Sequence, residues 1–212
     1  MKIILSLETK ESLDIIPYLG KYIDGVKINH LLWNELDFDV EEGKELFVDF
    51  KLWDTPNTVK TVVESIIKKG GTMTTISTFN NEKVFDELEQ YKDDIKLLAV
   101  TYLTSWNRDE QYQICREMPD FMWRRHLSRV KGFYGVVCSA QDIGMLSGAD
   151  KNLKRVYPGI TYGNNNSGQV RTTTPKEAQD LGADYIVIGR AITESENPLE
   201  TLKQIRNSPI TQ

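Results

Sequence analysis

Eight short segments rich in apolar and β-branched residues recur along the chain, and segments with a helical pattern lie between most of them. The eight strand-like segments are 1–8, 25–28, 46–51, 72–77, 95–101, 135–138, 155–158 and 185–189. Helices are expected over 10–22, 56–69, 81–91, 109–131 and 198–206, with a short helix after Ser139. This alternation predicts an α/β fold, a closed (β/α)8 TIM barrel, with residues 1–212 as a single domain. An open doubly wound sheet is the alternative, but no glycine-rich dinucleotide fingerprint follows the first segment, which also argues against a nicotinamide cofactor.

Three charges of alternating sign lie where the third segment ends. Asp49 and Lys51 are two residues apart, so both project from the same face of a strand. Thr55-Pro56 predicts the start of a helix, which leaves Asp54 on the turn just beyond the strand. A structural ion pair would explain two of these charges, but it does not explain three at a strand exit. A lysine held between carboxylates is a poised proton donor, and strand exits are where ligands bind in α/β folds.

Polar residues also lie at or just beyond the expected carboxyl ends of other strands. The full set is Glu8, Lys27, Asp49, Lys51, Asp54, Thr104, Ser139 and Arg190. In a (β/α)8 barrel these strand ends meet at one face, where active sites are built. The Gly- and Asn-rich segment 159–171 precedes the last strand, at a place where such barrels commonly bind phosphate through backbone N–H groups. Gly189-Arg190 adds a close backbone approach and a cationic fork, so the sequence predicts a phosphate site there.

Composition excludes several other classes of protein. The net charge of −5 and the absence of a basic stripe argue against nucleic acid or a membrane surface as a partner. The apolar runs are far shorter than a membrane span and no signal pattern begins the chain, so a cytoplasmic location is expected. Two cysteines and two histidines form no metal-binding or catalytic motif. Acid–base chemistry therefore falls to Lys, Asp or Glu, and no metal is expected.

Segment 49–58, with Lys27, 158–160 and 188–190, closely resembles the orotidine 5′-phosphate decarboxylase family. The likeness covers nearly the whole chain, including 103–105, 135–140 and 183–193. The Asp-x-Lys-x-x-Asp pattern is shared with magnesium-dependent sugar-phosphate decarboxylases and synthases of the same superfamily, but those carry a metal-binding Glu where this chain has Lys27. The resemblance implies conversion of orotidine 5′-phosphate to uridine 5′-phosphate, the last step of UMP biosynthesis, without a cofactor.

The resemblance also implies a role for each residue of the site. Lys51 would stabilise the carbanion that develops at pyrimidine C6 and then protonate it. Asp49 would lie against the departing carboxylate and hold Lys51, while Lys27 would contact Asp49 and the ribose. Asp54 and Thr58 would reach across a homodimer interface to the partner's ribose, which makes the active site composite. The remaining substrate-binding residues implied are Glu8 for the ribose, Thr104 and Ser139 for the pyrimidine, and Gln169, Gly189 and Arg190 for the phosphate.

Four positions depart from the family pattern. Glu8 replaces the usual Asp, Ser77 a common His, Thr161 a phosphate-contacting Arg of bacterial members, and Gly168 the Asp that usually precedes the glutamine. These changes affect ligand contacts more than the Lys/Asp/Lys/Asp core, so activity with looser substrate binding is expected. Two alternatives remain open: a magnesium-dependent sugar-phosphate decarboxylase or aldolase, and a non-catalytic nucleotide-binding homologue.

Overall fold

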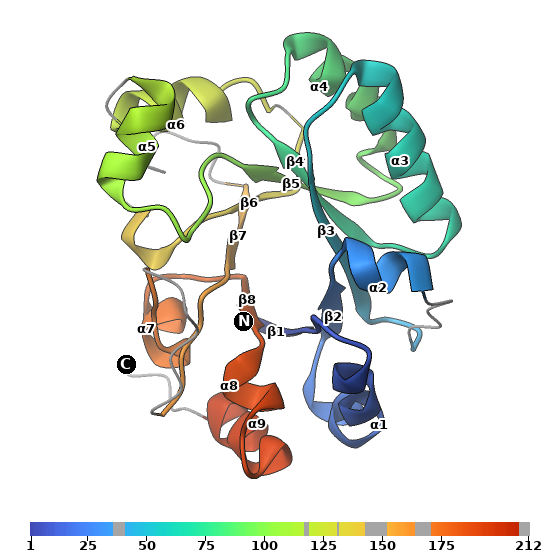
Figure 1. Cartoon of the computed structure of the whole chain (residues 1–212), viewed down its shortest axis with the longest axis vertical. Coiled ribbons are helices and arrows are strands. Elements are labelled where there is room, and N and C mark those ends of the chain that lie inside the picture. Colours follow the sequence, from blue (N-terminus) through green and yellow to red (C-terminus); the bar gives the residue numbers. More distant parts are fainter. Residues whose placement is uncertain (36–40, 117–118, 131, 143–151, 164–170, 208–212) are drawn as a thin grey trace.

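A computed structural model describes residues 1–35, 41–116, 119–130, 132–142, 152–163 and 171–207. Eight parallel strands follow one another in sequence order around a closed barrel (Figure 1). The strands are β1 (Lys2–Ser6), β2 (Gly25–Ile28), β3 (Glu45–Leu52), β4 (Met73–Ser77), β5 (Lys96–Val100), β6 (Gly135–Val137), β7 (Lys154–Tyr157) and β8 (Tyr185–Ile188). The barrel closes where β1 pairs in parallel with β8. The predicted (β/α)8 barrel is confirmed, and the open sheet is wrong.

Helices cover the outside of the barrel (Figure 1). They are α1 (Ile16–Leu19), α2 (His30–Glu35), α3 (Pro56–Lys68), α4 (Glu82–Leu88), α5 (Arg108–Cys115), α6 (Pro119–Leu127), α7 (Pro175–Asp180), α8 (Arg190–Thr193) and α9 (Pro198–Arg206). α3 begins at Pro56, as predicted from Thr55-Pro56, although the Thr55 side chain makes no capping bond. α9 has the predicted bounds. The sequence did not predict α2, α7 or α8.

Three expected helices are interrupted. The segment expected to be helical over 10–22 consists of a 3₁₀ turn, the four-residue α1 with proline in its first turn, and a second 3₁₀ turn. Segment 81–91 divides into α4 and a terminal 3₁₀ turn. The long helix expected over 109–131 is two helices, because Arg116 takes a left-handed conformation and Pro119 begins the next helix. After Ser139, a single helical turn over 140–142 ends the described stretch.

Side chains on the two faces of the strands build two apolar clusters. The barrel interior holds Ile4, Phe47, Met73, Leu98, Val156, Tyr185 and Val187. The opposite face packs against the helices, with Leu5, Val48 and Ile66 fully buried there. Phe47 and Val48 thus project in opposite directions, as period-two alternation requires. The next inward side chain after Phe47 on β3 is Asp49, so the apolar filling gives way to polar groups toward the carboxyl ends of the strands.

A buried carboxylate closes the other end of the barrel. Glu45, at the start of β3, is 4% exposed and forms ion pairs with Lys96 and, at 3.5 Å, with Lys2. The Thr72 hydroxyl donates to its second oxygen at 2.8 Å. The Tyr185 hydroxyl lies 3.4 Å from Glu45 Oε1 and 2.8 Å from the Tyr134 hydroxyl. All polar atoms of this carboxylate therefore have protein partners.

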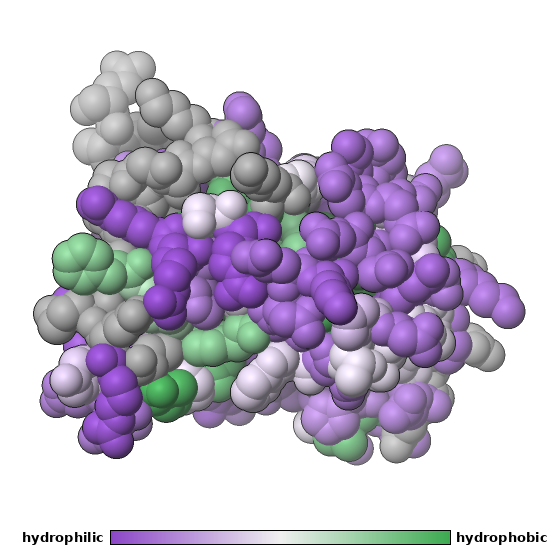
Figure 2. Space-filling view, turned by 90° about the horizontal axis from the view of Figure 1, so that it is seen from above, coloured by the Kyte–Doolittle hydropathy of each residue, from purple (hydrophilic) through white to green (hydrophobic). Residues whose placement is uncertain are grey.

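Hydrophilic side chains dominate the face of the molecule shown in Figure 2, with apolar residues scattered among them. The most exposed large apolar side chains among the described residues are Tyr18 at 75%, Phe121 at 73% and Trp53 at 71%. Trp53 lies on the turn between β3 and α3. Among the described residues, the helices are too short or too polar to cross a lipid bilayer.

Candidate active site

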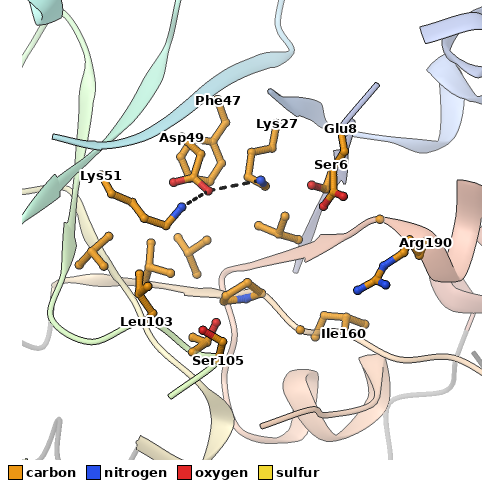
Figure 3. A pocket seen from close by; sticks show the side chains of 18 of the residues that line it. Ser6, Glu8, Lys27, Phe47, Asp49, Lys51, Leu103, Ser105, Ile160 and Arg190 are labelled. Atoms are coloured by element: carbon orange, nitrogen blue, oxygen red, sulfur yellow. Dashed lines mark hydrogen bonds and ion pairs between the residues drawn. The ribbon is translucent and has the colours of Figure 1, made fainter. Parts of the chain in front are cut away.

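A cavity of about 300 Å³ opens at the carboxyl ends of the strands. Its walls come from strands all around the barrel, including β1, β2, β3 and β8 (Figure 3). The predicted site residues that line it are Glu8, Lys27, Asp49, Lys51, Thr104, Gly189 and Arg190. A cavity of this size accommodates a small organic ligand. The structure thus brings together, at one place, polar residues from segments as far apart as 8 and 190.

One carboxylate and two ammonium groups form the charged wall of this cavity. Asp49 Oδ2 lies 2.9 Å from Lys51 Nζ and 3.3 Å from Lys27 Nζ (Figure 3). The Asp49 and Lys27 side chains are only 13% and 16% exposed, whereas Lys51 is 44% exposed. The ammonium of Lys51 is therefore held by a largely buried carboxylate while remaining accessible from the cavity.

The environment keeps the Asp49 carboxyl ionised. Burial raises its pKa, but the charges of Lys27 and Lys51 and the hydrogen bonds from Lys51 and Thr75 together outweigh burial and hold the pKa below its usual value. Thr75 donates its hydroxyl proton to Asp49 Oδ1 at 2.9 Å. Each carboxylate oxygen thus has a donor, and Asp49 stays negative at neutral pH.

The backbone of β3 departs from a regular strand at this point. The β3–β4 register shifts between Val48 and Leu52, and Lys51 has a φ of 52°. A left-handed conformation is uncommon for a residue with a side chain and costs about 1–2 kcal/mol. The predicted common orientation of Asp49 and Lys51 is confirmed, since both side chains line the cavity and touch each other. It is produced by an irregular strand rather than by simple alternation.

Asp54 and Thr58 lie outside the cavity of their own chain. Both are exposed on the turn and the first helical residues after β3. Asp54 accepts the N–H of Thr55 at 2.6 Å, and Thr58 shares a hydroxyl–hydroxyl hydrogen bond with Thr55 at 3.0 Å. The turn is fastened by buried Asn80, whose amide donates to Leu52 O at 2.8 Å and accepts from Asp54 N at 3.2 Å.

Ser139 is buried beside the cavity but does not line it. Its N–H and hydroxyl both donate to Asp142 Oδ2, at 3.0 Å and 2.9 Å. Arg171 pairs with the other oxygen of Asp142 at 2.6 Å and donates to the carbonyls of Leu103 at 3.2 Å and Thr104 at 3.3 Å. This buried network joins the chain after β5, the chain after β6 and the end of segment 159–171.

Arg190 lies at the opposite end of the cavity from Lys51 (Figure 3), and its neighbour Gly189 also lines the cavity. A Cβ at Gly189 would lie 3.3 Å from the Cβ of Ser6, so the close approach of β8 to β1 favours glycine here. Arg190 is exposed and points its guanidinium toward the cavity (Figure 3). The predicted phosphate ligand Gln169, with Gly168, lies outside the described residues. Of the other departures from the family pattern, Glu8 lines the cavity, whereas Ser77 and Thr161 do not.

Four polar residues near the site were not predicted from the sequence: Thr75, Asn80, Asp142 and Arg171. Several of their partners are far away in sequence: Thr75 and Asp49 are 26 positions apart, Arg171 and Asp142 are 29 apart, and Arg171 and Leu103 are 68 apart. No motif marks such residues, because their role depends on which strands and loops are neighbours. Among the described residues, no group of three or more His, Cys, Asp or Glu side chains is arranged to hold a metal ion.

Comparison with known proteins gives a consistent result. A family model described as Orotidine 5′-phosphate decarboxylase / HUMPS family matches residues 1–205. The chain is 33% identical to the orotidine 5′-phosphate decarboxylase of Dictyoglomus turgidum, over 94% of this chain and 90% of that protein. It is 34% identical to the enzyme of the same name from Actinobacillus pleuropneumoniae, over 98% of both. The crystal structure of orotidine 5′-phosphate decarboxylase from Lactobacillus acidophilus matches with a TM-score of 0.78 and 27% identity, over 100% of this chain and 99% of that one.

Proposed function

The chain belongs to the orotidine 5′-phosphate decarboxylase / HUMPS family, and we propose that it converts orotidine 5′-phosphate to uridine 5′-phosphate and carbon dioxide. This reaction is the last step of UMP biosynthesis, for which a cytoplasmic location is expected. The observation that carries the proposal is the Lys27–Asp49–Lys51 array on the wall of the cavity. It supplies a fixed positive charge beside a fixed negative one, in a place that a small ligand can enter.

Loss of carbon dioxide from C6 of the pyrimidine leaves an electron pair in an orbital that the ring cannot delocalise. Such a carbanion needs a positive charge that is already in position when the bond breaks. The Lys51 ammonium, 2.9 Å from Asp49 and open to the cavity, meets this need. Lys51 then gives a proton from Nζ to C6, which completes uridine 5′-phosphate and leaves a neutral amine.

Asp49 acts on both the lysine and the substrate. Its carboxylate fixes Lys51 Nζ and presents a negative charge to the substrate carboxylate. Because the pKa of Asp49 is held below its usual value, protonation does not relieve the repulsion, and loss of carbon dioxide does. Lys27, at 3.3 Å on the other side of Asp49, keeps this carboxylate in place and is within reach of a ribose hydroxyl bound in the same cavity.

Binding of the phosphate at the far end supplies the energy that brings the two carboxylates together. Arg190 presents a planar guanidinium suited to bidentate contact with phosphate oxygens, and Gly189 allows backbone approach. We assign Gln169 to the same phosphate, Glu8 to the ribose and Thr104 to the pyrimidine. We also assign Ser139 to the pyrimidine. Its hydroxyl donates a hydrogen bond to Asp142, so its oxygen would act as an acceptor for the pyrimidine.

A homodimer with composite active sites is part of the proposal. Asp54 and Thr58 are exposed outside their own cavity, next to Trp53, which is 71% exposed. A large exposed aromatic side chain is typical of a surface that becomes buried in an interface. Mixing Lys51→Ala with Asp54→Asn chains, each inactive alone, should therefore restore activity, because one of two sites in each mixed dimer regains both residues. Sedimentation as a monomer, or no recovery after exchange of subunits, would contradict the composite site.

The function is tested by following the ultraviolet absorbance of orotidine 5′-phosphate in the presence of EDTA. Turnover unaffected by the chelator is expected, and Lys51→Ala should lower kcat by about a thousandfold or more while the circular dichroism spectrum stays unchanged. Turnover of a sugar phosphate that requires magnesium, without turnover of orotidine 5′-phosphate, would support a magnesium-dependent sugar-phosphate decarboxylase or aldolase instead. Tight binding of uridine 5′-phosphate without any turnover would identify a nucleotide-binding homologue.

A further inference from the structure

We propose that Thr75 is a positioning residue for this reaction, because one hydroxyl on β4 holds the side chain of Asp49 and the backbone of Lys51 in the geometry described above. The inference rests on the proposed function for its kinetic part. Its structural part concerns only the free protein.

The pairing of β3 with β4 places Thr75 at a special position. Val48 is opposite Thr74, and Leu52 is opposite Ile76. Three residues of β3, namely 49 to 51, therefore stand against the single residue Thr75. Regular ladder hydrogen bonds cannot satisfy all the backbone groups of such a bulge, so some need other partners.

The Thr75 hydroxyl provides one of these partners. Lys51 N donates to Thr75 Oγ1 at 2.8 Å, and Thr75 Oγ1 donates to Asp49 Oδ1 at 2.9 Å. A hydroxyl has a single proton, so its donation to Asp49 leaves its lone pairs for the N–H of Lys51. Thr75 is 0% exposed, and bulk water has no access to replace it. One buried group thus links the two residues that face the reacting carbon.

The backbone of Lys51 depends on this acceptor. With a φ of 52°, Lys51 is in a conformation that an L-residue adopts only when its surroundings compensate the strain. Loss of the acceptor would leave the N–H of Lys51 without this partner and favour return of the strand to extended geometry. A change of register by one residue sends a side chain to the opposite face of a strand, which would take the Lys51 ammonium out of the cavity.

Two substitutions separate the hydroxyl from the shape of the side chain. Thr75→Val keeps the shape and removes the hydroxyl, and Thr75→Ser keeps the hydroxyl. We expect Thr75→Val to lower kcat by about 10- to 100-fold, the value of one hydrogen bond to a charged group. KM should change little, because the phosphate and ribose contacts are unaltered, and Thr75→Ser should restore most of kcat.

Thr74 supplies a matched control on the same strand. It is also 0% exposed, and its hydroxyl donates to Val48 O at 2.9 Å, on the face of β4 turned away from Asp49. Thr74→Val therefore removes a buried hydroxyl hydrogen bond between the same two strands without touching the site. It should lower the unfolding temperature about as much as Thr75→Val and leave kcat near that of the wild type. Equal losses of kcat in the two variants would overturn the proposal in favour of a purely structural role.

A second measurement does not need substrate. Carbon-13 NMR of labelled aspartate in the free protein reports the pKa of Asp49, assigned by comparison with Asp49→Asn. The pKa should rise in Thr75→Val, which loses a donor to the ionised form, and stay low in Thr74→Val and Thr75→Ser. An unchanged pKa in Thr75→Val would overturn the proposal whether or not the wild type decarboxylates orotidine 5′-phosphate. Absence of wild-type turnover with the expected pKa pattern would instead refute the proposed function alone.

Discussion

Strand β3 carries a similar arrangement of charges at each of its ends, and only one end is a candidate active site. At the start of the strand, Glu45 pairs with Lys2 and Lys96, and four residues later Asp49 pairs with Lys27 and Lys51. In both, burial raises the carboxyl pKa, and the neighbouring lysines and threonine together lower it below its usual value.

The two ends of β3 differ in what lies next to their charged groups. Beside Glu45, the rings of Tyr185 and Tyr134 lie against Lys2 and Lys96, and the two tyrosine hydroxyls are hydrogen-bonded to each other. The lysines paired with Asp49 face a cavity of about 300 Å³. The backbone differs too, because β3 pairs regularly with β2 from Glu45 onward, while its register against β4 shifts beyond Val48. A carboxylate with two lysines is therefore not a catalytic signature by itself; access and the orientation set by the bulge make it one.

The largest expected contrast comes from replacing each carboxylate by its amide. Asp49→Asn should lower kcat by at least about 100-fold, because it removes the charge that fixes Lys51 and opposes the substrate carboxylate. Glu45→Gln should keep activity within a small factor and instead lower the free energy of unfolding by about 1.5–3 kcal/mol, through weaker hydrogen bonds from Lys96 and Thr72. Absorbance assays and urea unfolding of both variants measure the contrast. A large loss of kcat in Glu45→Gln would break the distinction between the two ends.

Unfolding at acid pH tests whether the lowered carboxyl pKa at each end of β3 stabilises the fold. A carboxyl whose pKa is lowered on folding stabilises the native state fully above its unfolded pKa, near 4.5 for Glu and 3.8 for Asp, and loses this contribution as pH falls through the folded value. The unfolding free energy of the wild type should therefore decrease below about pH 4.5, because the unfolded state binds more protons. Glu45→Gln should show a shallower decrease in urea titrations between pH 7 and pH 3.5. An equally steep decrease would mean that Glu45 does not contribute.

The smallest expected effect concerns the Tyr134–Tyr185 pair beside Glu45. Tyr134→Phe removes the 2.8 Å hydrogen bond with Tyr185 and should cost about 1 kcal/mol or less, since Tyr134 is only partly buried. Activity should remain at the wild-type level, because this hydroxyl is at the opposite end of the barrel from the cavity. Thermal unfolding and the absorbance assay test both parts, and a reduced kcat would show that the two ends are coupled.

Features coded locally were predictable from the sequence. The eight strands follow from apolar runs, and the spacing of Asp49 and Lys51 predicted their shared orientation. The start of α3 followed from Thr55-Pro56, because a β-region residue before proline is a local preference. Convergence of the strand exits then followed from the fold class, which explains why Glu8 and Arg190 could be assigned to one cavity.

Features that depend on register or on loop neighbours were not predictable in the same way. The bulge at Lys51 requires knowledge of how far β3 advances against β4, and a Thr-rich strand gives no sign that Thr75 rather than Thr74 faces Asp49. The hydrogen bonds from the N–H and hydroxyl of Ser139 to Asp142 depend on the fold of the chain after β6, and no motif singles out Asp142. α5 ends at a left-handed residue, Arg116, where glycine would have been the usual signal, although Pro119 at the start of α6 is a local signal that sequence reasoning did not use.

The pairing of β1 with β8 has a consequence for the synthesis of the chain on the ribosome. β1 is synthesised before the other seven strands, whereas residues 185–188, which complete its hydrogen bonding, form the last of the eight strands to be made. Until β8 has been synthesised, one edge of β1 therefore lacks its native neighbour, and unpaired strand edges readily associate with other chains. We therefore expect the nascent chain to be prone to association until β8 is available, and a truncation that removes β8 to leave the barrel open.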